Sequence, residues 1–197
     1  MNFTFSEVID KNLLQKIFEF RYKIFLEIYP EYLSTSGFTN TQEFDKYDEY
    51  SENLAIFDED GNVCASVRLI HSSPIGYPTE NSMTFNKNNF QRDKLAEVSR
   101  IFIDKKYRSI KLTKIILDNL KKFMYVRMMQ LNIEYSYGSL EKNFLRLLKI
   151  HKMCYHTLEE EQICGCFGSR YPCILYTKQV GDDNPELIKL WEKKCEI

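Results

Sequence analysis

The sequence has 197 residues, a formal net charge of −1 and a hydrophobic fraction of 44%. These values suit one globular domain and argue against a disordered chain or a strongly basic nucleic-acid-binding protein. No apolar run approaches the roughly 20 residues of a membrane-spanning helix, and the first residues lack the features of a signal peptide. We therefore expect a single domain over residues 1–197 in the cytoplasm, with neither nucleic acid nor a membrane as its partner.

Hydrophobic periodicity and turn signals divide the chain into helices, strands and loops. The first helical stripe ends at Pro30, and Asp60-Gly61 is a strong hairpin signal between two apolar runs. In chain order we predict a helix over 11–29, a polar loop over 32–53 with at most a short helical turn, hairpin strands at 54–57 and 63–70, a polar connection over 71–94, a central strand at 95–104, an amphipathic helix over 110–130, a strand at 133–137, a helix over 140–155, short strands at 165–167 and 173–177, and a helix over 185–194. This order indicates an α/β fold with a mixed central sheet flanked by helices.

Cysteine and histidine side chains concentrate near the C-terminus. His151, Cys154, His156, Cys164 and Cys166 are close in sequence. Their spacing matches no familiar zinc-binding pattern, and no CxxC pair is present. In a reducing cytoplasm free thiols are expected rather than disulfides. We therefore predict no metal site.

The segment AEVSRIFID, residues 96–104, places two charged residues in an otherwise hydrophobic strand. Charged groups are rarely buried without partners, so Glu97 and Arg100 form either a structural ion pair or part of a site. A regular strand sends positions 97 and 100 to opposite faces. Both reach one site only if the strand has a bulge near Val98-Ser99, and bulges often occur beside active sites.

Arg21 lies on the apolar stripe of the first predicted helix, one turn before Phe25. A half-buried guanidinium needs a carboxylate, and the nearest candidates in sequence are Glu43, Asp45 and Asp48. Asp45 and Asp48 are three residues apart, so one helical turn would present both on one face. Such a pair either holds a substrate ammonium or forms a solvated acidic turn, and charged runs favour the solvated turn.

Five cations follow the central strand, namely Lys105, Lys106, Arg108, Lys111 and Lys114. They coincide with the predicted start of a helix, where free backbone N–H groups and the helix dipole attract anions. This segment is either a site for an anionic ligand, such as a pantetheine phosphate or an acidic carrier protein, or a solvated basic face.

Several motifs resemble those of one group of acyltransferases. The order of strand, charged crossover and amphipathic helix resembles the core of GNAT acyltransferases, and RSIKL (108–112) resembles their pyrophosphate-binding turn without its glycines. Four segments resemble motifs of the autoinducer synthases and N-acyl amino acid synthases: RYKIFLE (21–27), EFDKYDEYS (43–51), SVRLI (66–70) and EVSRIFI (97–103). Two further segments resemble those of N-acyl amino acid synthases and exosortase-associated acyltransferases: LEKNFLRLLKIHK (140–152) and GSRYPC (168–173).

The resemblance implies a GNAT-like fold and an N-acyltransferase. Such an enzyme moves a long fatty acyl group from acyl carrier protein or acyl-CoA, as co-substrate, to the amine of an amino acid or a similar small acceptor. No tightly bound cofactor is then expected. Autoinducer synthases carry a tryptophan at their S-adenosylmethionine pocket, in a region where this chain has Tyr29, Tyr32 and Phe38. This difference argues against the synthesis of homoserine lactones and favours an amino acid as the amine acceptor. The motifs also leave open a conventional acetyl-CoA-dependent N-acetyltransferase and a non-catalytic module that binds acyl thioesters or a carrier protein.

The same resemblance assigns roles to individual residues. Glu97 and Arg100 are the expected catalytic residues, with Glu97 as acceptor of the amine proton. The expected substrate-binding residues are Arg21, Phe25, Asp45, Asp48, Arg68, Ser99 and Phe102. The expected residues for the acyl donor are Ile101, Phe102, Ile103, Lys105, Lys106, Arg108, Ser109 and Lys111.

Overall fold

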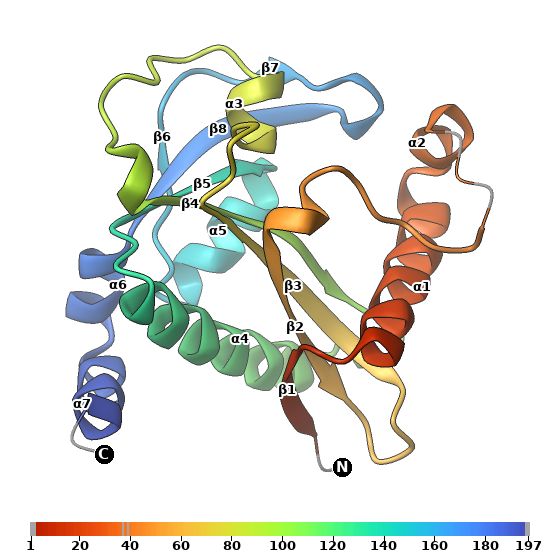
Figure 1. The fold of residues 1–197 in the computed structure, drawn as a ribbon, viewed down its shortest axis with the longest axis horizontal. Helices are drawn as coiled ribbons and strands as arrows, with labels where there is room; N and C mark the ends of the chain where they lie inside the picture. Colours follow the sequence, from red (N-terminus) through yellow and green to blue (C-terminus); the bar gives the residue numbers. More distant parts are fainter. Residues whose placement is uncertain (1–2, 37, 39, 196–197) are drawn as a thin grey trace.

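The computed structural model describes residues 3–36, 38 and 40–195, and it contains a mixed sheet with helices on both faces (Figure 1). The strands are β1 (Thr4–Val8), β2 (Ser51–Phe57), β3 (Val63–His71), β4 (Leu95–Ile103), β5 (Tyr135–Leu140), β6 (His156–Thr157), β7 (Gln162–Ile163) and β8 (Ser169–Tyr176). The α-helices are α1 (Lys11–Ile28), α2 (Pro30–Thr35), α3 (Pro78–Ser82), α4 (Ile110–Gln130), α5 (Lys142–Ile150), α6 (Thr177–Asp183) and α7 (Pro185–Cys195). Short 3₁₀ turns are η1 (Asp48–Tyr50), η2 (Arg92–Lys94), η3 (Lys105–Tyr107) and η4 (Gly165–Phe167).

The sheet has the order β1-β2-β3-β4-β5-β8-β6, and β7 pairs with β8. β4 and β5 are parallel, whereas the other strand pairs of the described residues are antiparallel. The predicted α/β fold with a mixed sheet is therefore confirmed. Among the described residues, none of the helices has the length and apolar character of a membrane span.

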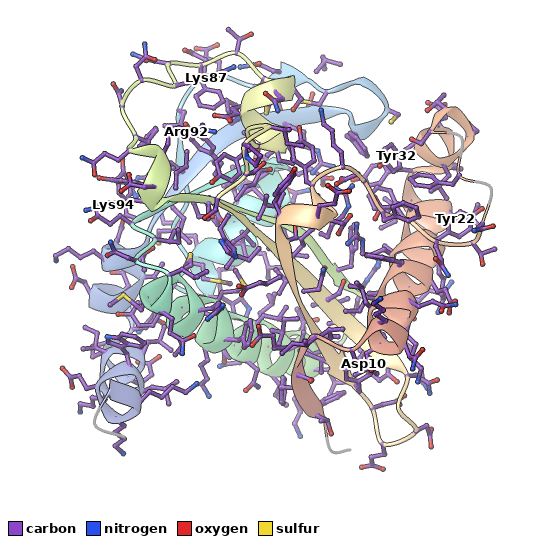
Figure 2. The ribbon with its side chains drawn as sticks, viewed as in Figure 1. Asp10, Tyr22, Tyr32, Lys87, Arg92 and Lys94 are labelled. Carbon is purple, nitrogen blue, oxygen red and sulfur yellow. The ribbon has the colours of Figure 1, made fainter. Side chains whose placement is uncertain are left out.

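The two faces of the sheet are covered by different helices. Leu54 and Ile56 of β2 belong to the core beneath α4, whereas Ala55 and Phe57 pack with residues of α1. Because successive strand residues point to opposite faces, α1 and α4 lie on opposite sides of the sheet (Figure 1). α1 begins after Asp10, whose carboxylate accepts hydrogen bonds from the first free N–H groups of the helix (Figure 2).

Long periodic elements agree with the sequence prediction, and short ones differ. The predicted strand at 165–167 is wrong, because these residues form η4 between Gly165 and Gly168, which have φ angles of 53° and 71°. The strand expected at 173–177 begins earlier, at Ser169, and the helix expected over 140–155 is limited to α5 because residue 140 still belongs to β5. β1, β6, β7, α3 and α6 were not anticipated as elements, and α2 overlaps the segment in which at most a short helical turn was expected.

β4 contains a β-bulge, but at a different position from the one expected near residues 98–99. The register between β3 and β4 shifts by one residue, so that Arg100 and Ile101 both lie opposite Val67. Arg100 has a φ of 53°, and its guanidinium lies 4.9 Å from the ring of Phe25 on α1. Ile101 packs with the core beneath α4. The bulge thus turns Arg100 toward the α1 face and returns the next residue to the opposite face.

Candidate active site

β4 and β5 separate after a short paired segment. They pair at Leu95–Tyr135, Ala96–Ser136 and Glu97–Tyr137, and β4 then continues to Ile103 without β5 beside it. A cleft of about 1960 Å³ lies at this opening. Its walls come from β4, the C-terminal end of α1, the α3 segment, the first half of α4, α5 and the turn before β8.

Three arginines and three carboxylates form an ion-pair network on the α1 side of the cleft. Arg21 is fully buried; its Nε donates to Glu43 at 2.6 Å, and its two terminal nitrogens donate to Asp48 at 2.8 and 2.9 Å. Arg100 donates to Glu43 at 2.6 Å and to Asp45 at 2.9 Å. Burial disfavours the charged form of Glu43, but Arg100 and Arg21 outweigh this effect and lower its pKa to about 2.

Arg68 completes the network from β3. Its Nη1 donates to Asp45 at 2.7 Å and to Asp48 at 2.9 Å, and its Nε donates to the hydroxyl of Ser99 at 3.0 Å. The side chains of Asp45 and Asp48 are 22% and 8% exposed. The expectation of a solvated acidic turn is therefore wrong, because the buried guanidinium groups of Arg21 and Arg68, together with Arg100, draw these carboxylates inward.

Glu97 lies apart from the network at the inner end of the cleft. Its two oxygens accept hydrogen bonds from the backbone N–H and the hydroxyl of Thr79, at 2.8 and 2.9 Å. Glu97 is 2% exposed, and this burial raises its pKa to about 7 against the opposing effect of Thr79. The alternative of a structural ion pair with Arg100 is wrong, since the partner of Glu97 is Thr79. A carboxyl group with a pKa near neutrality is suited to accept a proton.

Thr79 belongs to α3, inside the segment that the sequence left as a polar connection. Glu80 fixes this short helix, since its carboxylate accepts hydrogen bonds from Tyr77 N–H at 2.9 Å and from Arg92 at 2.5 Å. Lys87 donates to the backbone carbonyl of Glu80. Arg92 and Lys87 reach α3 from the loop that follows it (Figure 2). The loop thus holds Thr79 over Glu97. A long polar connection inside a compact domain indicates a functional loop, but sequence reasoning assigned no role to Thr79.

The basic residues after β4 spread out instead of converging on one point. Arg108 and Lys114 line the cleft, and Arg108 donates from Nε to the carbonyl of Ile103 at 2.8 Å. Lys105 lies 3.5 Å from Glu27, and Ser109 caps α4 by accepting from Leu112 N–H at 3.3 Å. Of the residues expected to bind the donor, Ile101, Phe102, Ile103 and Arg108 line the cleft, whereas Lys105, Lys106, Ser109 and Lys111 lie outside its walls.

Of the expected substrate-binding and catalytic residues, those at the surface of the cleft are Phe25, Asp45, Glu97, Ser99, Arg100 and Phe102. Arg21, Asp48 and Arg68 lie behind this surface, inside the network. A second cavity of about 30 Å³ lies between β4 and α4. Val98 and Ile101 line both the cleft and this cavity, whose other walls are mostly apolar.

Aromatic rings form the wall of the cleft opposite α4. Phe25 lies 5.2 Å from Phe102 and 4.8 Å from Tyr32, and Phe167 lies 5.1 Å from Tyr32, as ring centroid distances. Figure 2 shows Tyr32 beside the C-terminal end of α1. Tyr29 also faces Phe167, with a centroid distance of 5.2 Å. We call these five residues the aromatic wall.

Arg170 and Glu141 adjoin the aromatic wall, and sequence reasoning assigned neither of them to the site. Nη2 of Arg170 forms an ion pair with Glu141 at 2.9 Å and donates a hydrogen bond to the hydroxyl of Tyr29 at 2.5 Å. All three residues line the cleft. The motif GSRYPC contains Arg170, so the signal was present in the sequence, but the motif alone did not place it beside Tyr29.

The histidines and cysteines near the C-terminus have separate partners. His151 lies 3.3 Å from Asp118, and His156 lies 2.7 Å from Gln179. The described thiols of residues 64, 154, 164, 166 and 173 are not in disulfides. Within the part of the chain that the structure describes, no group of three or more His, Cys, Asp or Glu side chains is arranged to hold a metal ion.

Comparisons with known proteins identify the family and the fold. Residues 20–118, half of the chain, match the family described as "Acetyltransferase (GNAT) domain". A comparison with curated proteins found no significant match. The AHL synthase LasI is similar in structure, with a TM-score of 0.72 and 16% identity over 92% of this chain and 94% of LasI.

Two further solved structures are similar over most of their length. BjaI, a CoA-dependent acyl-homoserine lactone synthase determined with SAM and isopentyl-CoA, has a TM-score of 0.70 and 14% identity, over 94% of this chain and 90% of BjaI. FeeM, an N-acyl amino acid synthase from uncultured soil microbes, has a TM-score of 0.62 and 12% identity, over 92% of this chain and 94% of FeeM. At these identities the likeness establishes the fold, and it confirms the predicted resemblance.

Proposed function

The chain belongs to the family of GNAT acetyltransferase domains, and from this premise we propose that it is an N-acyltransferase whose proton acceptor is Glu97. The observation that carries this proposal is a buried carboxyl group, with a pKa raised to about 7, at the inner end of a large cleft beside the bulge of β4. The acyl group comes from an acyl thioester, and the acceptor is the amine of a small molecule, with an amino acid as the favoured class.

The amine attacks the thioester carbonyl directly, so that the new C–N bond forms and the C–S bond breaks without an acyl-enzyme. The sulfur leaves as a thiolate, which afterwards takes a proton from Glu97 or water. The excess proton of the amine passes to Glu97, directly or through water. Thr79 occupies one acceptor position on each oxygen of Glu97 and leaves the carboxylate able to accept another hydrogen bond. Arg21, Arg68 and Arg100 hold Asp45 and Asp48 in place and keep the network beside the reacting groups neutral.

Backbone N–H groups of residues 101–103 are the proposed donors to the oxyanion. The N–H of Asp104 donates to the carbonyl of Cys64 on β3. Since backbone groups alternate between the two edges of a strand, this bond supports an orientation of the Ile103 N–H toward the cleft and of the Phe102 N–H toward β3, so Ile103 is the favoured donor. The developing charge on the thioester oxygen would lie there.

The size of the cleft and the apolar character of the adjoining cavity favour a long acyl chain over acetyl. Val98 and Ile101 separate the two spaces, so small movements of these side chains would let the end of an acyl chain enter the core beneath α4. The RSIKL turn lacks the glycines of a typical CoA-binding turn, so both acyl carrier protein and acyl-CoA are candidate acyl donors. Arg108 and Lys114, at the cleft, are the proposed contacts for the phosphate of either donor.

Mass spectrometry of lipid extracts tests the proposal, because it reports the acyl chain and the amine in one product. Cells that overproduce the protein should accumulate an N-acylated small molecule that cells producing Glu97→Gln lack. An N-acyl homoserine lactone as the product would assign the acceptor to the S-adenosylmethionine class. Accumulation of an N-acetylated product alone would favour the conventional acetyltransferase. No new acylated amine in the overproducing cells would contradict the proposed function.

A further inference from the structure

We infer that Arg170 binds the carboxylate of the acceptor and that Glu141 competes with this carboxylate for the same guanidinium. The inference rests on the proposed N-acyltransferase function and adds two points to it. The acceptor carries a carboxylate, and the residue that recognises it lies at the start of β8 and not in the arginine network.

The arginine network offers no vacant cation for a substrate. Arg21, Arg68 and Arg100 are matched by Glu43, Asp45 and Asp48, so the charges sum to zero. A substrate carboxylate brought there would have to displace a buried carboxylate, which would then be left without its partner. Among these arginines only Arg100 reaches the surface of the cleft, with a side chain 15% exposed and bonds to two carboxylates.

Arg170 is in a different position, because its carboxylate partner is close to solvent. The side chain of Glu141 is 48% exposed, whereas that of Arg170 is 13% exposed. Glu141 can therefore turn into water at little cost, and an incoming carboxylate would take over its place with the same charge. Ion pairs of arginine with carboxylates are directional, so this exchange also orients the acceptor.

The rest of Arg170 is held in place. Its Nε donates to the carbonyl of Phe167 at 3.2 Å, and its guanidinium lies 5.7 Å from the ring centre of Tyr29. The hydroxyl of Tyr29 bonds both Arg170 and Glu141, the latter at 2.9 Å. When a substrate carboxylate replaces Glu141, the hydroxyl of Tyr29 can donate its hydrogen bond to the substrate carboxylate instead. Two prearranged donors thus surround one exchangeable carboxylate position.

The aromatic wall connects this position to the reacting end of the cleft. Phe167 packs against Phe25 at 6.2 Å, and Phe25 packs against Phe102 of β4 at 5.2 Å, as centroid distances. Arg170 lies at one end of this row of rings, and Arg100 lies over Phe25 toward the other. An acceptor anchored at Arg170 would therefore extend along the aromatic wall in the direction of β4.

The experiment measures acylation of free amino acids against the corresponding amides. The purified protein is given an acyl-CoA or acyl carrier protein donor and each of the twenty L-amino acids, either as the free acid or as the carboxamide. Products are quantified by mass spectrometry. We expect the free acids to be preferred, and Arg170→Gln to reduce this preference by about 10- to 100-fold, the effect of losing a hydrogen-bonded charge. The KM of the acyl donor should stay unchanged.

A second variant, Glu141→Gln, is expected to improve the binding of free amino acids, whereas Arg170→Gln weakens it. Glu141→Gln removes the competing carboxylate, so it should lower the KM of a free amino acid several-fold and leave that of the amide unchanged. A purely structural role of the pair would not produce this improvement, and the result stands even if Arg170→Gln fails to fold. Lys142→Gln is the matched control, because Lys142 is exposed, adjoins Glu141 and lies outside the cleft walls.

The outcomes separate this inference from the proposed function. Equal use of acids and amides by the parent protein would overturn the assignment of Arg170 while leaving N-acylation intact. An unchanged acid preference in Arg170→Gln, or a raised KM for acids in Glu141→Gln, would do the same. If neither acids nor amides were acylated with either donor, the proposed function itself would fail.

Discussion

Arg21 shows how one buried charge organises residues that are distant in sequence. Its side chain is completely enclosed and bonds Glu43 and Asp48, which hold the loop after α2 against β3 and β4. Ionised groups of this kind are stable inside a protein only while their partners are present. Pairing explains why the apolar stripe of α1 tolerates an arginine, and the sequence already indicated a carboxylate from residues 43–48 as the partner.

Replacement of Arg21 by methionine should destabilise the protein strongly. Glu43 and Asp48 would then share an unbalanced buried charge, at a cost of about 3–5 kcal/mol in the free energy of unfolding. Adding Glu43→Gln restores neutrality and should recover part of this loss. Urea denaturation of the single and double variants measures both effects. Lys16→Met, an exposed change on the same helix, is the control, and a double variant no more stable than Arg21→Met would contradict the account.

Glu97 makes the stability of the fold depend on pH. Burial raises its pKa from an ordinary value of 4.5 to about 7, so the folded protein binds this proton more tightly than the unfolded chain does. The contribution to stability is present below pH 4.5 and is lost as the pH rises through 7. Glu97→Gln should therefore become more stable relative to the parent between pH 5 and pH 8, by about 2.5 kcal/mol. If the difference in unfolding free energy between Glu97→Gln and the parent were the same at pH 5 and pH 8, the pKa of Glu97 would not be raised in the folded protein.

At the scale of elements, β4 and α3 together position the side chains of the candidate active site. The bulge at Arg100 and Ile101 brings Arg100 to the face that Glu97 shares, and α3 places Thr79 over Glu97. The need for a bulge followed from the period of a strand, because two charges three residues apart cannot otherwise share a face. Its position could not be predicted, since it depends on the register with β3.

Thr79→Val tests the part played by α3. The change removes one of two hydrogen bonds to the charged form of Glu97, and loss of such a bond raises a carboxyl pKa. The rising limb of the pH–rate profile, expected near pH 7 in the parent, should move upward by about 1–2 units. Thr79→Ser keeps the hydroxyl and serves as the control. A Thr79→Val profile that superimposes on that of the parent would remove Thr79 as a positioning residue.

Long elements were predicted from the sequence, whereas most short ones were missed. α1, the β2–β3 hairpin, β4 and α4 carry clear periodicity or turn signals, and all were anticipated. β1 and α3 are short, and each is stabilised by contacts outside the element itself: β1 pairs with the distant strand β2, and Glu80 of α3 is held by Arg92 and Lys87 from the segment that follows. Local patterns do not contain such contacts, and the same reason kept Thr79 out of the predicted site.

At the scale of the whole molecule, the cleft exists because β4 and β5 pair over a few residues and then separate. Segments from both halves of the chain reach its walls, from Phe25 of α1 to Arg170 of β8. The sequence motifs identified the residues near Glu97 because they occur within short segments. The pairing of Tyr29 with Arg170, 141 positions apart, required the structure.

The most direct test of the central claim is the rate of acyl transfer by purified Glu97→Gln compared with the parent protein. The measurement follows thiol release from the acyl donor together with formation of the N-acyl product, at pH 7.5 and saturating substrates. Proton transfer by a positioned carboxylate contributes roughly 10²–10⁴-fold, so we predict a loss of kcat of that size with little change in the KM of the donor. A folded Glu97→Gln protein with kcat within a few-fold of the parent would show that Glu97 is not the proton acceptor.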